Sequence, residues 1–270
     1  MIKICPMSWW PFKKSSNKLT VEFLALYPHL QDTYPIYPAK DLTLPWIKES
    51  QTSLSNTSII QKITKKKVHK CAGIRDFHNK GWIIPAWHDF IIETNGDGES
   101  FRSHVPSDYL NKVLNGARPI SSFGASQYGS LPSSGLPQNT LMGIVKLSMP
   151  WVFRITPGWG LMMCPLEYTK EHRFTSAIGI IDPNVTPQLN VILYWHILNG
   201  ATSIKAGTPL CRLLPVPLND TWNLSVRQAN TEEKDYNEAC TILSQSHWSN
   251  FNSKVLTHLY DTVILKNARL

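Results

Sequence analysis

The chain has 270 residues, of which 42% are hydrophobic and 17% are charged. This composition excludes an intrinsically disordered chain and allows one large domain with a sizeable core. The formal net charge of +8 permits contact with nucleic acid or another acidic surface, although most basic residues are scattered along the chain. Nineteen prolines and ten tryptophans favour short strands joined by rigid loops over a helix bundle.

We expect residues 1–67 to form an N-terminal extended arm and linker. Residues 19–28 are typical of a strand, and the proline-rich, aromatic segment 34–48 predicts an arm that buries its rings against a domain or a neighbouring subunit. Trp46 is the candidate contact residue of this arm. A basic cluster follows, and it indicates either a solvated linker or a site for nucleic-acid phosphates. The cluster contains Lys62, Lys65, Lys66, Lys67 and Lys70.

A β domain is predicted over residues 68–217. Its first unit, residues 68–94, begins with an expected strand at 68–74. The run Asn95-Gly96-Asp97-Gly98 then predicts a hairpin turn. The Ser-, Gly- and Pro-rich segment 115–140 predicts a long loop or covering strap.

The densest strand pattern lies between residues 141 and 217. Residues 141–155 and 159–168 predict one hairpin around the turn Thr156-Pro157-Gly158. Three further strands are expected within residues 174–183, 189–198 and 209–216. This block therefore predicts a mainly β fold.

Residues 218–270 are predicted to be a C-terminal helical segment. Residues recur there at steps of three or four from Tyr236 to Leu259, and acidic residues open the segment. The spacing predicts a helix of about 25 residues, with Thr231 as its N-terminal cap.

Two arginines interrupt the apolar strands and are candidates for a binding or interface site. Arg212 alternates with apolar neighbours, so its side chain leaves the strand on the opposite face, and a rim or subunit contact is the favoured interpretation. If Arg154 and Arg212 lie on neighbouring strands, their charges repel unless an acidic group or a bound anion separates them. We therefore expect one of them to contact a carboxylate, with Asp182 and Glu167 as the first candidates.

The other candidate contact residues are aromatic or lie beside an aromatic residue: Trp87, Trp159, Trp195 and His196. Tryptophans in strands are typical of core or sheet-rim packing, and an exposed ring also suits a binding platform. The five cysteines form no CxxC pair and the histidines match no metal-ligand spacing, so we expect reduced thiols, no metal and no cofactor. Because signatures such as GxSxG, HExxH and GxGxxG are missing, no catalytic residue is predicted.

Residues 179–216 resemble the closing part of the dUTPase and dCTP deaminase fold. The segment reads GIIDPNVTPQLNVILYWHILNGATSIKAGTPLCRLLPV, in which an Asp-containing strand leads to an apolar strand and then to a Lys-x-Gly turn. The resemblance implies a nucleotide site between the subunits of a trimer, and it carries over to Asp182 and to the turn at Gly207. The uracil-site motif and the serine-containing phosphate motif of that family have no match in the sequence.

Most of residues 38–216 also resemble an uncharacterised protein family of marine tailed phages and bacteria. The landmarks are PAKDLTLPWIK (38–48), KCAGIRDFHNKGWIIPAWHDFII (70–92), PWVFRITPGWGLMMCPLE (150–167) and AGTPLCRLLPV (206–216). This resemblance implies a phage or bacterial context and no particular reaction.

Together these observations predict a mainly β fold, a distorted sandwich or barrel with β-clip-like character, with an N-terminal extended arm and a C-terminal helical segment. We expect a non-enzymatic binding or assembly protein, a structural component of a phage virion attached to the capsid or another particle part. The alternative is a dUTPase-like nucleotide-binding or nucleotide-hydrolysing protein that uses Asp182 with Arg154 or Arg212. Expected partners are further copies of the chain and other virion or host proteins, in the virion or the host cytoplasm. No apolar run approaches the length of a membrane span, so no membrane partner is expected.

Overall fold

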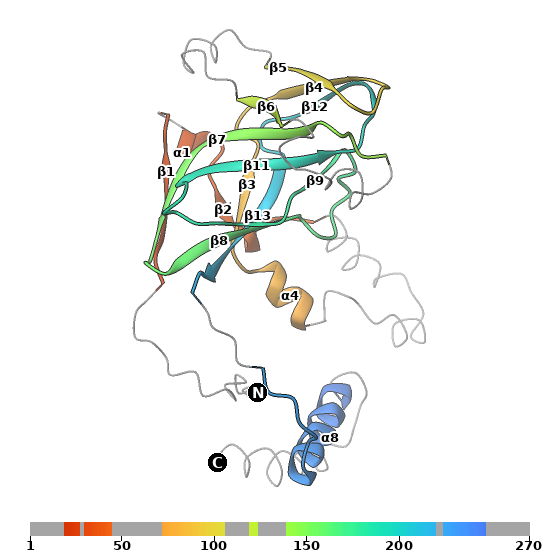
Figure 1. Cartoon of the computed structure of the whole chain (residues 1–270). Helices are drawn as coiled ribbons and strands as arrows, with labels where there is room; N and C mark the ends of the chain where they lie inside the picture. Colours follow the sequence, from red (N-terminus) through yellow and green to blue (C-terminus); the bar gives the residue numbers. More distant parts are fainter. Residues whose placement is uncertain are drawn as a thin grey trace, which may run out of the picture. The chain divides into compact units, whose positions relative to one another are not determined.

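The computed structural model describes residues 19–27, 30–44, 72–105, 119–123, 139–219 and 224–246. Contacts divide the chain into two compact units, one of residues 19–220 and the other of residues 1–18 with 221–270. The first unit is a β domain (Figure 1). Within the described residues, no helix is both long enough and apolar enough to cross a membrane.

The first sheet is built around the long strand β7 (Ile144–Ile155). One edge of β7 pairs with β1 (Val21–Ala25) and with β6 (Ile120–Phe123), and the other edge pairs with β11 (Gln188–Trp195). Strand β9 (Phe174–Ser176) follows β11 and ends the sheet. Alternate residues of β11 point into the core, because successive strand residues face opposite sides of a sheet. These buried residues are Leu189, Val191, Leu193 and Trp195.

Two further antiparallel sheets complete the domain. The second has the order β10 (Gly179–Ile181), β8 (Trp159–Cys164), β13 (Pro209–Pro217), β3 (Trp82–Pro85) and β2 (Tyr37–Pro38). The third has the order β12 (Asn199–Ile204), β4 (Phe90–Asn95) and β5 (Phe101–His104). The β4–β5 hairpin turns at the predicted Asn-Gly-Asp-Gly run, so that prediction is confirmed.

One hydrophobic core joins the sheets. It contains Phe153 and Trp195 from the first sheet, Leu161 and Leu213 from the second, and Ile204 from the third. The prediction of a mainly β fold is therefore confirmed. The strands described here pack as a distorted sandwich and do not close into a barrel.

The hairpin expected between residues 141–155 and 159–168 is wrong. Both edges of β7 are already paired within the first sheet, so the chain crosses at the turn Thr156-Pro157-Gly158 and β8 joins the second sheet. The segment 174–183, expected as one strand, is likewise divided. Its first half, β9, ends the first sheet and its second half, β10, ends the second.

The β domain also begins earlier than the sequence predicted. Strands β1 and β2, the helix α1 (Leu30–Thr33) and a short 3₁₀ helix, η1 (Ala39–Asp41), lie in the unit that starts at residue 19, although 1–67 was expected to be an arm and linker. In place of a strand at 68–74, residues from Ala72 form helix α4 (Ala72–His78). Helix α4 holds a single β-branched residue, Ile74, so its local preference for a strand is weak.

The second unit contains helix α8 (Thr231–Ser246). Asn230, and not Thr231, caps its N-terminus: the side chain of Asn230 accepts from the backbone N–H of Glu233, and the Glu233 carboxylate accepts from the Asn230 N–H. This reciprocal pair is a capping box, which places the cap one residue before the predicted position. Residues 247–270, which include the rest of the predicted helix, lie outside the described residues.

Candidate functional site

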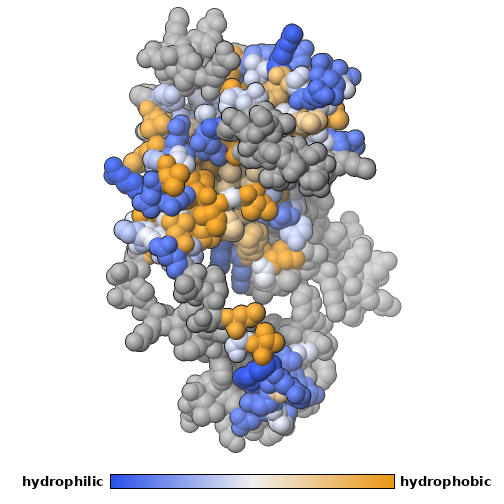
Figure 2. All heavy atoms as spheres, in the orientation of Figure 1, coloured by the Kyte–Doolittle hydropathy of each residue, from blue (hydrophilic) through white to orange (hydrophobic). Residues whose placement is uncertain are grey.

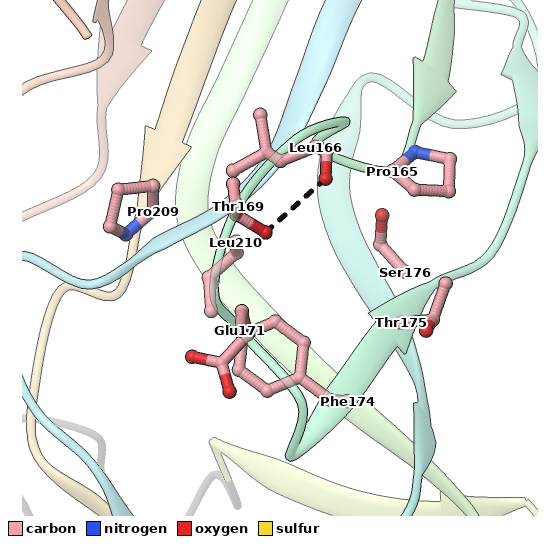
Figure 3. A pocket seen from close by; sticks show the side chains of 9 residues that line it. All are labelled: Pro165, Leu166, Thr169, Glu171, Phe174, Thr175, Ser176, Pro209 and Leu210. Carbon is pink, nitrogen blue, oxygen red and sulfur yellow. Dashed lines mark hydrogen bonds between the residues drawn. The ribbon is translucent and has the colours of Figure 1, made fainter. Parts of the chain in front are cut away.

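A pocket of about 70 Å³ opens where β9, the loop that precedes it and the start of β13 meet (Figure 3). We call it the β9 pocket. Its apolar lining comes from Pro165, Leu166, Phe174, Pro209 and Leu210. The ring of Phe174 stacks against the ring of Trp195, and the two ring centroids are 6.4 Å apart. The predicted contact residue Trp195 is thus fully buried and supports the wall of the pocket.

Four polar residues complete the lining: Thr169, Glu171, Thr175 and Ser176. The hydroxyl of Thr169 donates to the carbonyl of Leu166 at 3.4 Å. Figure 3 shows Ser176 and Pro165 toward one end of the pocket and Glu171 and Phe174 toward the other. The pocket therefore has polar groups at both ends and an apolar wall between them.

Glu171 is neutralised by an arginine that follows it two residues later. Arg173 donates from Nε to the carboxylate at 2.8 Å and forms a second bond from Nη2, which makes the pair bidentate. Burial raises the pKa of Glu171, but the hydrogen bonds and the charge of Arg173 outweigh burial, so the pKa is lowered overall. Arg173 also donates to the carbonyl of Ser203 and so ties the β9 pocket to β12.

His196 lies between two threonine hydroxyls beside the pocket. Its Nε2 is 2.9 Å from Thr175 Oγ1, and its Nδ1 is 3.2 Å from Thr140 Oγ1. Burial lowers the pKa of His196, which favours a neutral ring at neutral pH. The predicted contact residue His196 therefore orients one wall residue of the pocket.

Ser176 is the residue of the pocket with a buried hydroxyl that lacks a hydrogen-bond partner. Its side chain is 2% exposed, and its Oγ has no hydrogen-bond partner in the structure. It lies opposite Leu193 in the sheet, so it faces the core side of β9. A buried hydroxyl left unpaired costs about 1–3 kcal/mol, and such a group is normally satisfied by water or by a ligand.

The outer face of the second sheet carries two neighbouring rows of side chains. Residues directly opposite each other on antiparallel strands share a face. The covered row consists of Cys164, Arg212 and Ile83, which oppose one another across β8, β13 and β3. The open row consists of Ile180, Met162 and Leu214, which oppose one another across β10, β8 and β13.

The C-terminal end of helix α4 lies over Arg212 in the covered row. Arg212 Nη1 is 2.7 Å from the carbonyl oxygen of Lys80, 2.9 Å from that of His78 and 3.0 Å from that of Phe77. An NH₂ group has two hydrogens, so one of them is shared. The guanidinium also lies 4.9 Å from the centre of the Phe77 ring. Arg212 therefore caps the C-terminal end of α4, where carbonyls lack partners within the helix.

The rim position expected for Arg212 is wrong. The predicted alternation is correct, because Arg212 does face away from the core, but α4 covers that face and leaves the residue 2% exposed. Burial lowers the pKa of the Arg212 guanidinium from its usual high value. Its hydrogen bonds are to backbone carbonyls, whereas the sequence suggested a carboxylate.

Arg154 and Arg212 lie in different sheets and are not neighbours. Arg154 is 76% exposed and lies 3.7 Å from the carboxylate of Glu22 on β1, so one arginine does contact a carboxylate, but the partner was not predicted. Asp182 accepts from the backbone N–H and the side-chain amide of Asn184 at the turn after β10. In the described hydrogen bonds and ion pairs, Asp182 meets neither arginine of the nucleotide hypothesis.

The remaining candidate residues fall into two groups. Trp87 is buried in the core and packs edge-on against Phe90 at 6.1 Å, and Trp159 is half-buried at the start of β8. Trp46 and the basic cluster lie outside the described residues, so their proposed contacts stay predictions. The cysteines 164 and 211 are buried and free, in agreement with small core-like residues.

Sequence reasoning missed the residues that form the β9 pocket. Ser176 and Glu171 carry no motif, and their significance depends on a wall supplied by β13, more than thirty residues later. The Glu-x-Arg spacing of Glu171 and Arg173 was a usable signal, since residues two apart on extended backbone share a side. Sequence reasoning also missed the open row, because its residues come from three strands and the register between those strands cannot be read from the sequence.

Among the described residues, no group of three His, Cys, Asp or Glu side chains is arranged to hold a metal ion. No family model matches the sequence, and no curated protein matches it. Among solved structures, the chain is similar to a mutant dUTPase of phage phi11 of S. aureus that was described with a structural Mg(II) ion. The two chains are 10% identical, the match covers 78% of this chain and 97% of that chain, and the TM-score is 0.33.

Proposed function

We propose that the protein is a non-enzymatic assembly protein, a structural component of a phage particle, which associates with further copies of itself. The observation that carries the proposal is the open row on the outer face of the second sheet. Ile180 is 60% exposed there, and Ile178, two residues earlier, is 72% exposed. Large apolar side chains gathered on one surface are typical of protein–protein contacts.

The shape of this surface favours a protein partner. Figure 2 shows hydrophobic side chains gathered on one face of the β domain, in the region of β8 of the second sheet and β11 of the first. Strand β10 ends the second sheet, and no described strand pairs with its outer edge. An unpaired edge beside apolar side chains is a template for pairing with another strand. A second copy offers the same edge and the same apolar row, which makes the contact self-complementary.

The particle context comes from the sequence resemblance over residues 38–216. Mass spectrometry of purified phage particles tests it directly. We expect peptides of this chain in the particle at a fixed ratio to other particle proteins. Absence from particles, with abundance in infected-cell lysate, would overturn the virion role.

The association is tested with the substitution Ile180→Lys. A lysine at the centre of the contact must leave water without a partner, so we expect self-association to weaken at least about tenfold. Sedimentation equilibrium over a range of concentrations measures the effect. Val226→Lys is the matched control, because Val226 is 84% exposed in the second unit and the same change is made there.

Two results would contradict the association. One is a native chain that stays monomeric at every concentration. The other is an Ile180→Lys chain, folded by circular dichroism, that associates as strongly as the native chain.

A further inference from the structure

We propose that two copies of the chain pair antiparallel along the open edge of β10, with the two Gly179 residues facing each other across a two-fold axis. The inference rests on the proposed self-association and deepens it, because it names the residues that oppose each other in the contact. It starts from the end of the second sheet, where β10 pairs with β8 on one side and with no described strand on the other.

The backbone of β10 shows which groups point toward the open edge. The carbonyl oxygen of Ile181 points toward β8, because a Cβ atom added at Gly160 of that strand would lie 2.8 Å from it. In an antiparallel ladder a residue directs its N–H and its carbonyl to the same side, and the next residue directs both to the opposite side. The N–H and the carbonyl of Ile180 therefore point away from β8, where a further strand can bond to them.

The exposed side chains beside this edge limit the possible registers. Ile178 and Ile180 are 72% and 60% exposed, and alternate residues of extended backbone share a face. Residues directly opposite each other on antiparallel strands also share a face. The isoleucines of both copies therefore lie on one face only when the two-fold axis passes a residue and not the bond between two residues.

Of these registers, the one centred on Gly179 matches apolar side chains best. It places Ile178 of each copy opposite Ile180 of the other. A register centred on Ile180 would place Ile178 opposite Asp182, and a carboxylate taken out of water beside an isoleucine gains no partner. A register centred on Ile178 would need Ser176 as a partner of Ile180, but Ser176 is already paired with Leu193 in the first sheet.

The register also fixes a distance at the two-fold axis. Ile180 would exchange both backbone hydrogen bonds with Ile178 of the second copy. The two Gly179 residues then form a non-hydrogen-bonded pair, in which the Cα atoms are about 4.5 Å apart. Disulfides form where Cα atoms lie about 4.4–6.8 Å apart. Nothing lies within 4 Å of a Cβ atom added at Gly179, so a cysteine side chain has room there.

Gly179→Cys tests the register in the full chain. After mild oxidation, a non-reducing gel measures the fraction of chain that migrates as a disulfide-linked dimer. We expect this fraction to exceed that of the native chain, whose five cysteines set the background, at least about tenfold. Ser122→Cys is the matched control, because it places a cysteine at an exposed position of β6 in the first sheet, and it should stay at the background.

Two further substitutions measure the register without a cross-link. Ile178→Lys and Ile180→Glu each place a charge opposite an isoleucine, so each alone should weaken self-association at least about tenfold. When both are made in one chain, the register centred on Gly179 brings opposite charges together at both pairs. Association should then be at least about threefold stronger than in either single variant. In the register centred on Ile180, the two introduced carboxylates would oppose each other and association should fall further.

The outcomes separate the register from the association itself. Cross-linking at residue 179 together with recovery in the double variant supports the register. If the native chain associates in sedimentation equilibrium, then background cross-linking at residue 179 in a folded chain, or further loss in the double variant, overturns the register and leaves the association standing. A native chain that stays monomeric overturns both. The double variant keeps Gly179, so it decides the register even if Gly179→Cys does not fold.

Discussion

The covered row and the open row lie side by side on one sheet face but end in opposite surroundings. Arg212, the one charged residue of the two rows, is buried, whereas Ile180, an apolar residue, is 60% exposed. The C-terminal end of α4 lies over Arg212 and buries it, whereas Ile180 remains exposed at the other end of the same sheet face. Apolar character along a strand therefore does not by itself decide which side chains are buried. The position of the next layer decides it.

Helix α4 and the covered row depend on each other. The last carbonyls of a helix have no partner within it, and α4 ends beside Arg212, which is only 2% exposed. Arg212 donates to two of these carbonyls, those of Phe77 and His78, and to the carbonyl of Lys80 just after the helix, and the negative end of the helix in turn stabilises its charge. Among the described residues, no such hydrogen bonds fix a helix over the open row, and Ile180 is 60% exposed there.

The largest expected effect comes from a substitution at Gly81, where the chain that leaves α4 passes close to the second sheet. This glycine follows α4 with a φ of +79°, and a Cβ atom there would lie 2.1 Å from the carbonyl oxygen of Leu213. Gly81→Ala should lower the free energy of unfolding by more than about 3 kcal/mol, because backbone strain and a backbone clash add. Urea unfolding followed by circular dichroism measures the loss.

Gly158→Ala is the control for Gly81→Ala. Gly158 has nearly the same φ, +82°, but nothing lies within 4 Å of its added Cβ. It should lose only the cost of the left-handed backbone, about 1–2 kcal/mol. Equal losses in the two chains would show that the close contact with Leu213 has no part in holding the covered row.

A smaller effect is expected when the capping cation is removed. Arg212→Met keeps the aliphatic stem but leaves two carbonyls of α4, those of Phe77 and His78, and the carbonyl of Lys80 without their donor, which should cost about 2–4 kcal/mol of unfolding free energy. Arg154→Met removes an exposed ion pair and should cost less than about 1 kcal/mol. Comparable losses for the two arginines would contradict the contrast between the buried and the exposed charge.

Patterns within one segment predicted much of the fold. The strand near residue 21, the hairpin turn at Asn95-Gly96-Asp97-Gly98 and the outward face of Arg212 all follow from local alternation and turn chemistry. These features need only neighbours in sequence, so the sequence suffices for them.

The features that failed prediction depend on distant segments. The turn at residues 156–158 predicts a hairpin from sequence alone. The prediction fails because β1 and β11 pair with the two edges of β7 and leave no edge for β8. Burial of Arg212 depends on a helix more than 130 residues earlier. Ser176 gains its significance from the β13 wall of the pocket. In each case the sequence contains the residue, but it does not show which distant segment packs against that residue.

The smallest effect concerns acid, and it separates the β9 pocket from the covered row. The pKa of folded Glu171 is lowered, so the pair with Arg173 stabilises the protein fully above the ordinary carboxyl pKa of about 4.3. That stabilisation is lost as the pH falls through the lower folded pKa, and for a partly exposed pair it is less than about 1 kcal/mol. Hydrogen exchange, corrected for intrinsic rates, should therefore rise around β9 below pH 4 in the native chain.

Glu171→Gln isolates the contribution of this carboxyl. The variant has nothing to protonate at residue 171, so the acid-dependent rise around β9 should disappear, while exchange at higher pH should already be faster than in the native chain. His78, whose pKa burial lowers, titrates beside Arg212 in both chains, so its effect on α4 cancels in the difference between them. The native-minus-variant difference should be confined to β9 and the loop before it. A difference that appears equally in α4 would mean that the two regions unfold together and that the pocket has no local stability of its own.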